Sequence, residues 1–283
     1  MRGRAVLALA LLPALLVFAA AFVVPLLGVG VESVRLFTPG RVGSAAGAPF
    51  TAANYVELAN PAFLGLLAET FRISLLATLT GLVISYPLAW HIVRKFSPSA
   101  RMLTAGLLFT MILLSMLVRT YAIELTFGSV GVLRPVLRAA GIAPTSGWYI
   151  ELLVGAGLIH YIIPLSTLTL LGTVQNVDPR LVDAAQSLGA PAWRAHASIT
   201  LPLSRAGLVG AFLVAFAFSI SAFVIPLVLG KGRVLFVSNT IYNRFSEIAD
   251  YPSGTAISVV ILAVSLVAVM LVSLLSPRPA AQT

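Results

Sequence analysis

Six long apolar runs restrict the fold of this chain more than any other feature of its sequence. Each run has about the 20 residues with which an α-helix crosses the hydrocarbon core of a bilayer. Because the runs are continuous and do not alternate apolar with polar residues, they favour helices over the strands of a membrane barrel. We therefore expect an all-α, polytopic membrane protein with six transmembrane helices, forming a single transmembrane domain over residues 1–283. The predicted spans are about 5–31, 73–93, 102–123, 152–174, 206–230 and 256–276.

The composition agrees with a lipid environment. Hydrophobic residues make up 59% of the chain and charged residues 10%, and the mean hydropathy is +1.02. This is too little polar surface to cover a water-soluble globule, so a lipid bilayer is the expected surrounding. The net charge of +9 comes from basic residues that stand mostly singly near the ends of apolar runs. Without a basic run interleaved with aromatic residues, we expect no nucleic-acid binding. With no cysteine, disulfides and thiolate metal sites are excluded.

Two features predict the orientation in the membrane. The first run is longer than the roughly 7 to 15 apolar residues of a signal peptide, so we expect it to remain as an anchor. Arg94, Lys95 and Arg101 crowd the very short connection after the second run. Short connections rich in Lys and Arg face the cytoplasm, which places both chain termini there.

Small residues recur at every fourth position in two of the runs. Such stripes let helix backbones approach closely in a membrane, although alanine and glycine are also simply common in apolar helices. Pro87, Pro164 and Pro226 each remove a backbone hydrogen bond and predict kinks, which serve packing or line a water-filled cavity. The two stripes are Ala77, Gly81, Ser85 and Ala89, and Gly207, Ala211, Ala215 and Ser219.

The segment 176–202 is too polar to cross a membrane and carries the signals of two short helices. Asp178 is a good helix N-cap and Pro179 suits the first helical position, where a missing N–H costs nothing. Gly189 stands where a helix ends in the left-handed region. We expect a second helix from Pro191 to about Thr200, after which Leu201 and Pro202 turn the chain into the fifth run.

This segment resembles the "EAA" loop of binding-protein-dependent ABC importer permeases. In that family the loop is a coupling helix that docks on the ATPase subunit and transmits its closure to the pore. The usual acidic residue is Glu, and here it is Asp183, one methylene shorter. The residues that carry the resemblance, and the predicted ATPase-coupling site, are Asp183, Ala184, Ala185, Gly189, Ile199, Leu201 and Pro202.

The resemblance implies a permease of the bacterial inner membrane that is not itself an enzyme. A dimer of ATPase subunits would bind ATP and Mg²⁺, so this chain would need no cofactor. A second homologous permease subunit and a periplasmic solute-binding protein would complete the importer. The chain agrees in one respect: Gly230-Lys231-Gly232 has neither the spacing nor the hydroxyl residue of a phosphate-binding Gly-x-x-x-x-Gly-Lys-Ser/Thr loop.

The resemblance extends from about Glu69 to Val272 and is nearest to spermidine/putrescine permease subunits. It is carried further by Tyr86-Pro87-Leu88-Ala89, by Leu117-Val118-Arg119-Thr120-Tyr121, and by the stretch 239–256. In that last stretch Arg244 and Tyr251 replace the Gln and Trp that the family tends to have. The resemblance therefore favours a polyamine as cargo, with opines, aminophosphonates and amino-acid-like anions, which related permeases carry, as the alternative.

Candidate residues for a translocation path are few. No Asp or Glu lies near the middle of any run; the acids, Glu124 and Asp250 among them, are expected at a solvated outer rim. Arg119 lies deep in an apolar run, where a charge is costly if it meets lipid. It would either line the path or extend to the outer interface. The full candidate set is Arg119, Tyr121, His160, Tyr161 and Phe223.

Two other functions are less consistent with the sequence. A secondary transporter would show central carboxylates or a repeated pair of broken helices, and the runs offer neither clearly. An intramembrane hydrolase would rest on Ser253 with His160 alone, without a companion motif. The His-Glu-x-x-His helix of a metalloprotease is absent from the sequence.

Overall fold

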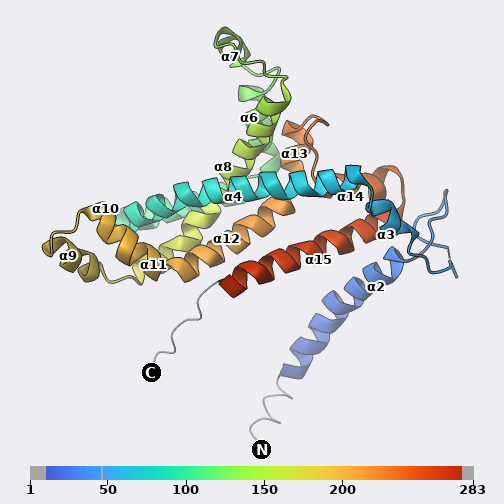
Figure 1. The fold of residues 1–283 in the computed structure, drawn as a ribbon, viewed down its shortest axis with the longest axis horizontal. Helices are drawn as coiled ribbons and strands as arrows, with labels where there is room; N and C mark the ends of the chain where they lie inside the picture. The colour runs from blue at the N-terminus through green and yellow to red at the C-terminus, as the bar shows by residue number, and fades with distance from the viewer. Residues whose placement is uncertain (1–10, 46, 276–283) are drawn as a thin grey trace, which may run out of the picture. The chain divides into compact units, whose positions relative to one another are not determined.

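The computed structural model describes residues 11–45 and 47–275, which are helical apart from their connections (Figure 1). Residues 5–10 of the first predicted span and Ser276 of the last lie outside the described residues. The predicted all-α class is confirmed. In chain order the elements, with η for a π-helical turn, are η1 (Ala19–Val23), α2 (Val24–Ser33), α3 (Ala53–Leu58), α4 (Pro61–Lys95), α5 (Pro98–Leu113), α6 (Met116–Phe127), α7 (Arg134–Ala139), α8 (Gly147–Gln175), α9 (Pro179–Ser187), α10 (Ala192–Ala195), η2 (His196–Thr200), α11 (Leu201–Leu203), α12 (Arg205–Ile220), α13 (Val224–Leu229), α14 (Val237–Tyr242), η3 (Asn243–Glu247) and α15 (Tyr251–Leu275).

Four continuous helices are long and apolar enough to cross a membrane: Leu11–Ser33, α4, α8 and Tyr251–Leu274. Two bent pairs add up to two further crossings. The pair α5 and α6 bends by 88°, and the pair Ala192–Leu203 and α12 bends by 70°. The described residues therefore hold four to six candidate spans.

The third predicted span, 102–123, is not one helix. The chain leaves α5 at Leu114 and enters α6 after Ser115, and both residues have extended backbone with ψ of 139° and 125°. Ser115 is of a residue type that favours helix N-caps over helix interiors. Hydropathy cannot detect this bend, because the apolar residues continue on both sides of it.

The fifth predicted span, 206–230, is also interrupted. Helix α12 ends at Ile220, and α13 begins at Val224. Pro226 explains the position of the restart. In a continuous helix its ring would meet the preceding turn, whereas in α13 it falls in the first turn, where an N–H has no helical partner.

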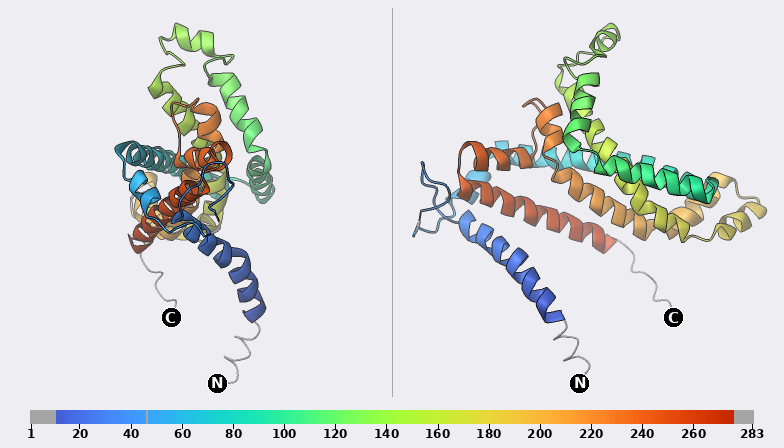
Figure 2. Two further views of the ribbon diagram at one scale, coloured as in Figure 1. Left: turned by 90° about the vertical axis from the view of Figure 1, so that its right-hand side faces the viewer. Right: turned by 180° about the vertical axis from the view of Figure 1, so that it is seen from behind.

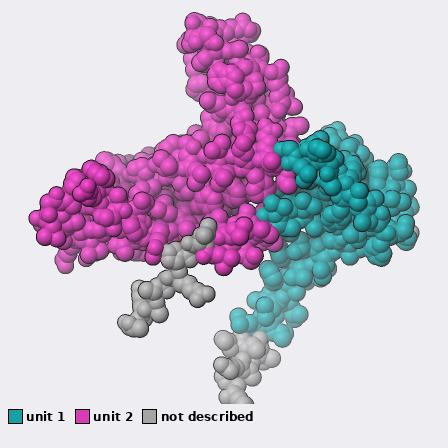
Figure 3. Space-filling view, in the orientation of Figure 1, with its two compact units in different colours: residues 1–65, 240–264 teal, residues 66–239, 265–283 magenta. Residues whose placement is uncertain are grey.

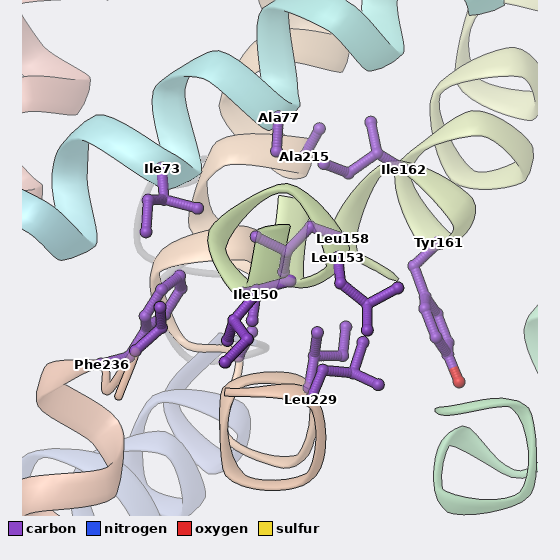
Figure 4. Close-up of a cluster of buried hydrophobic side chains, with 14 of the residues drawn as sticks. Ile73, Ala77, Ile150, Leu153, Leu158, Tyr161, Ile162, Ala215, Leu229 and Phe236 are labelled. Carbon is purple, nitrogen blue, oxygen red and sulfur yellow. The ribbon is translucent and has the colours of Figure 1, made fainter. Parts of the chain in front are cut away.

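Helix α8 is the centre of the residues 66–239. It is apolar all around, and α5, α12 and α13 pack on it. Helix α4 also contacts it, through Gly81 against Ile162 and through the Ser85 hydroxyl, which donates to the Ile163 carbonyl. Figure 4 shows Ile73 and Ala77 of α4, Ala215 of α12 and Leu229 of α13 around the α8 side chains, among them Leu158.

Both small-residue stripes lie at these helix interfaces. On α4, Ala77, Ser85 and Ala89 are buried, and a Cβ on Gly81 would collide with Ile162 of α8. On α12, Ala211, Ala215 and Ser219 are buried, and a Cβ on Gly207 would collide with Thr173 of α8. The predicted close packing is confirmed for both helices.

The chain divides into two compact units, residues 1–65 with 240–264 and residues 66–239 with 265–283 (Figure 3). In the first unit, the Asn54 amide donates to the carbonyls of Ser33 and Arg35, at 2.9 Å each. In the same unit, Arg244 pairs with Glu57 at 3.1 Å and with Asp250 at 3.4 Å. Asp250 was expected on a solvated rim but is buried, and it also caps α15 by accepting from the Ser253 amide.

Candidate functional site

The loop 176–202 forms the predicted pair of short helices at one end of α4, α8 and α12 (Figure 1; Figure 2, right). We call residues 178–203 the coupling hairpin, after the role that the sequence predicts for this segment. Its first arm, α9, begins as expected: the Asp178 carboxylate accepts from the Arg180 amide at 2.9 Å, with Pro179 at the first helical position.

The end of α9 also follows the prediction. Gly189 has φ +90°, in the left-handed region. The Ala190 amide donates to the Ala185 carbonyl at 3.1 Å, and the Gly189 amide to the Gln186 carbonyl at 2.9 Å. These two bonds define a Schellman motif, which reverses the chain within one residue and needs the left-handed conformation there.

The second arm of the hairpin differs from the prediction. Leu201 and Pro202 do not turn the chain, since α10, η2 and α11 continue the helical path to Leu203, and the 70° bend follows. The wide turn η2 explains this: its last bond joins the Leu201 amide to the His196 carbonyl. A helix widened in this way tolerates the missing N–H of Pro202.

The hairpin has an inner and an outer surface. Val182 and Ala195 are buried against the rest of the unit. Asp183 and Ala184 are exposed. Leu188 is 90% exposed and Trp193 68%. Two large apolar side chains of this polar loop therefore lie on its surface.

Contacts from the end of α4 reach the hairpin and the residues just before it. Arg94 donates to the Val174 carbonyl at 3.1 Å and also to the Val177 carbonyl, just before the Asp178 cap. The rings of Trp90 and His196 meet edge to face, with centroids 4.5 Å apart. His196 Nδ1 also lies 3.2 Å from the Thr200 hydroxyl.

A pocket of about 390 Å³ lies between the end of α4 and the hairpin. Burial lowers the pKa of His196 from its ordinary value, and the positive charge of Arg94 lowers it further. Sequence reasoning missed Trp90 and used Arg94 only to orient the chain; no local pattern indicates that either supports the hairpin. The pocket is lined by Trp90, Arg94, Lys95, Pro179, Val182, Asp183, Gln186, Ala192 and His196.

Three of the five candidate path residues come together, one on α6 and two on α8. The Arg119 guanidinium carbon lies 3.6 Å from the centroid of the Tyr161 ring. The His160 ring is next to Tyr161, with centroids 5.9 Å apart. Arg119 is only 8% exposed, because it packs against Tyr161.

The other two candidates lie apart from this cluster. Tyr121 is exposed on α6. Phe223 lies at the break between α12 and α13, where its carbonyl accepts from the side-chain amide of Asn239 at 3.0 Å. Glu124, expected on a solvated rim, is instead buried on α6 and forms an ion pair with Lys231. Lys231 also donates to the Ser129 hydroxyl at 2.6 Å.

Comparison with known proteins identifies the class to which this helical membrane protein belongs. Residues 81–280 match the family described as the binding-protein-dependent transport system inner membrane component. The chain belongs to this family. It is a multi-pass permease component of an ABC transporter in the inner membrane, and the ATPase partner, not this chain, binds ATP.

Two similar proteins are both spermidine/putrescine transport system permease proteins, PotB. The one from Haemophilus influenzae is 30% identical over 213 residues, covering 75% of this chain and 74% of the relative. The one from Escherichia coli K12 is 28% identical over 212 residues, covering 74% and 77%.

A solved structure has the same fold. It is the bacterial alginate ABC transporter in complex with an alginate pentasaccharide-bound periplasmic protein. Its chain aligns with a TM-score of 0.70 at 20% identity, covering 98% of this chain and 96% of that one. At this identity the likeness concerns the fold alone.

Proposed function

We propose that this chain is the permease subunit of an importer for a polyamine of the spermidine/putrescine class. The observation that carries this proposal is the 30% identity over 75% of the chain with a spermidine/putrescine permease. A periplasmic binding protein would deliver the cargo, and a second homologous permease subunit would complete the path. ATP binding and hydrolysis by two ATPase subunits would drive alternating access.

The coupling hairpin is the proposed contact with the ATPase. Its support is that the hairpin contacts α4 on one side and exposes large side chains on the other. Trp90 contacts His196 of the hairpin and Arg94 binds the chain just before it, while Leu188 and Trp193 are exposed. An element fixed on one side and exposed on the other can transmit a displacement to the helices that hold it.

An anionic solute, such as an opine, an aminophosphonate or an amino-acid-like compound, is the second candidate cargo. The observation that favours it is the buried Arg119 guanidinium, which has no hydrogen-bond acceptor among the described residues. A buried cation of this kind would welcome a carboxylate or phosphonate.

Reconstitution of the complete importer tests the proposal. The permease, its companion subunit, the ATPase and the binding protein would be placed in proteoliposomes, and ATP-driven uptake of labelled spermidine measured. We expect unlabelled putrescine to compete with this uptake and an opine not to compete with it. Competition by the opine and not by putrescine would instead favour the anionic solute as the cargo. Uptake driven by an ion gradient without the ATPase would contradict the importer mechanism itself.

A further inference from the structure

Arg119 makes an unusual contact for a buried cation. Its guanidinium lies over the face of the Tyr161 ring, 3.6 Å from guanidinium carbon to ring centroid. The residue is 8% exposed, and Nε, Nη1 and Nη2 are all buried without a hydrogen-bond acceptor among the described residues. The aromatic face is therefore the main compensation that this charge receives.

A contact of this kind is attractive but incomplete. A desolvated guanidinium gains from the negative face of an aromatic ring. It still lacks acceptors for its five N–H donors, and burying such donors unpaired is costly. Another cation that interacts better with the Tyr161 ring would therefore displace the Arg119 guanidinium from it.

The acid nearest along the helix does not relieve this cost. Glu124 is buried on the same helix, α6, but its ion pair is with Lys231.

Tyr161 lies among other aromatic rings. Its ring stacks on the Phe218 ring, with centroids 5.7 Å apart. The His160 ring meets it edge to face, with centroids 5.9 Å apart. The Tyr161 hydroxyl is buried, with Arg119 and Thr120 as its polar neighbours. Figure 4 shows this hydroxyl directed away from the apolar cluster that surrounds α8. A pocket of about 350 Å³, lined in part by Arg119, His160 and Thr126, opens beside them.

We infer that the face of Tyr161 is a cation subsite of the translocation path and that Arg119 occupies it when no cargo is present. An ammonium group of the cargo displaces the guanidinium, takes the ring face and donates to the Tyr161 hydroxyl. The released guanidinium enters the adjacent pocket, where water can satisfy its donors. This inference rests on the proposed polyamine cargo and assigns to Arg119 the role of an internal competitor for it.

Two pairs of variants test the subsite in the complete reconstituted importer. Tyr161→Phe keeps the ring and removes only the hydroxyl, whereas Tyr161→Leu removes the ring. Arg119→Lys keeps a cation, whereas Arg119→Met removes the competitor at similar length. Spermidine uptake would be measured against the concentration of loaded binding protein, and each purified complex would be checked for stoichiometric ATPase subunit.

We expect Tyr161→Phe to retain uptake within about threefold and Tyr161→Leu to lower it at least tenfold. Arg119→Met should lower the KM severalfold, while Arg119→Lys stays near the wild type. Equal losses in the two Tyr161 variants, or a raised KM in Arg119→Met with an intact complex, would overturn the subsite while leaving the cargo in place. Absence of polyamine uptake by the wild type would overturn the cargo and the subsite together.

Discussion

The ring of Trp90 on α4 meets the ring of His196 in η2 edge to face, with centroids 4.5 Å apart and planes at 75°. Residue 90 lies in the last part of a 35-residue helix, and residue 196 lies in the coupling hairpin. One helical turn further along α4, Arg94 donates to the Val174 carbonyl near the end of α8. If the hairpin is the proposed ATPase contact, its displacement would pass through the Trp90–His196 contact to α4, which is long enough to cross the membrane.

Trp90→Ala should uncouple ATP hydrolysis from transport. The variant removes the aromatic contact and enlarges the pocket behind the hairpin, so the hairpin can move without moving α4. We expect ATPase activity to persist and uptake per ATP hydrolysed to fall severalfold, measured together in proteoliposomes. Trp90→Phe is the matched control, since it keeps an aromatic edge or face for His196. An unchanged ratio in Trp90→Ala would mean that this contact does not transmit the movement.

The pH dependence of the hairpin follows from His196. Burial and Arg94 lower its pKa, so the folded protein binds fewer protons at this site than the unfolded chain does. The contribution of His196 to the free energy of unfolding therefore rises with pH from its lowered folded-state pKa to about 6.5. This stability is lost as the pH falls through the same interval. Arg94, Lys95 and Asp183 line the pocket with His196. The two cations among them, Arg94 and Lys95, disfavour a third positive charge on the His196 ring.

We accordingly expect the coupling ratio of the wild type to fall on acidification below about pH 6.5. His196→Phe should retain an aromatic contact with Trp90 and show a flatter profile over the same range. The measurement is uptake per ATP between about pH 5.5 and 8, with ATPase activity recorded in parallel. Identical profiles for the two proteins would exclude His196 as the titrating group.

Gly189→Val should displace the exposed surface of the coupling hairpin. The backbone here has φ +90°, and a side chain in the left-handed region costs about 1–2 kcal/mol, with β-branched residues the worst placed. Nothing lies within 4 Å of a Cβ built on Gly189, so the effect comes from the backbone and not from a collision. We expect binding-protein-stimulated ATPase activity to be lost with membrane insertion intact. Gly189→Asn, which tolerates this conformation, should keep most of the stimulation.

The ends of the first hairpin helix were predictable because their signals are local. Asp178, Pro179 and Gly189 act on backbone groups within a few residues of themselves, and each takes the expected role. The small-residue stripes were equally predictable, since a close helix contact needs small side chains at that spacing whichever helix it meets.

The bends could not be predicted in the same way. Hydropathy averages over a window, and the runs that contain Leu114 and Ser221 stay apolar across their breaks. Ser115 and Pro226 are compatible with a break but do not require one. The bends depend on how α6 and α13 pack against each other and on α8, which is tertiary information.

The candidate path was predicted as a set of residue types and not as a cluster. Arg119 and Tyr161 lie on different helices, and only the packing of α6 against α8 brings them into contact. Glu124 was placed on a rim because charged residues near the ends of apolar runs are usually solvated. Its burial depends on Lys231, which is distant in the sequence and adopts an uncommon φ of 49°.

Gly207 and Gly210 on α12 offer a matched test of the α8 interface. A Cβ on Gly207 would collide with the side chain of Thr173, while a Cβ on Gly210 would meet nothing within 4 Å. Gly207→Ala should therefore force α12 away from α8 and destabilise the protein by about 1–3 kcal/mol, the usual cost of overpacking. Gly210→Ala adds a better helix former in open space and should be neutral or stabilising by up to about 1 kcal/mol. Thermal unfolding of the purified complex measures both, and transport should fall only in Gly207→Ala. Equal melting temperatures for the two variants would show that α12 and α8 adjust freely, and that the stripe does not set the distance between them.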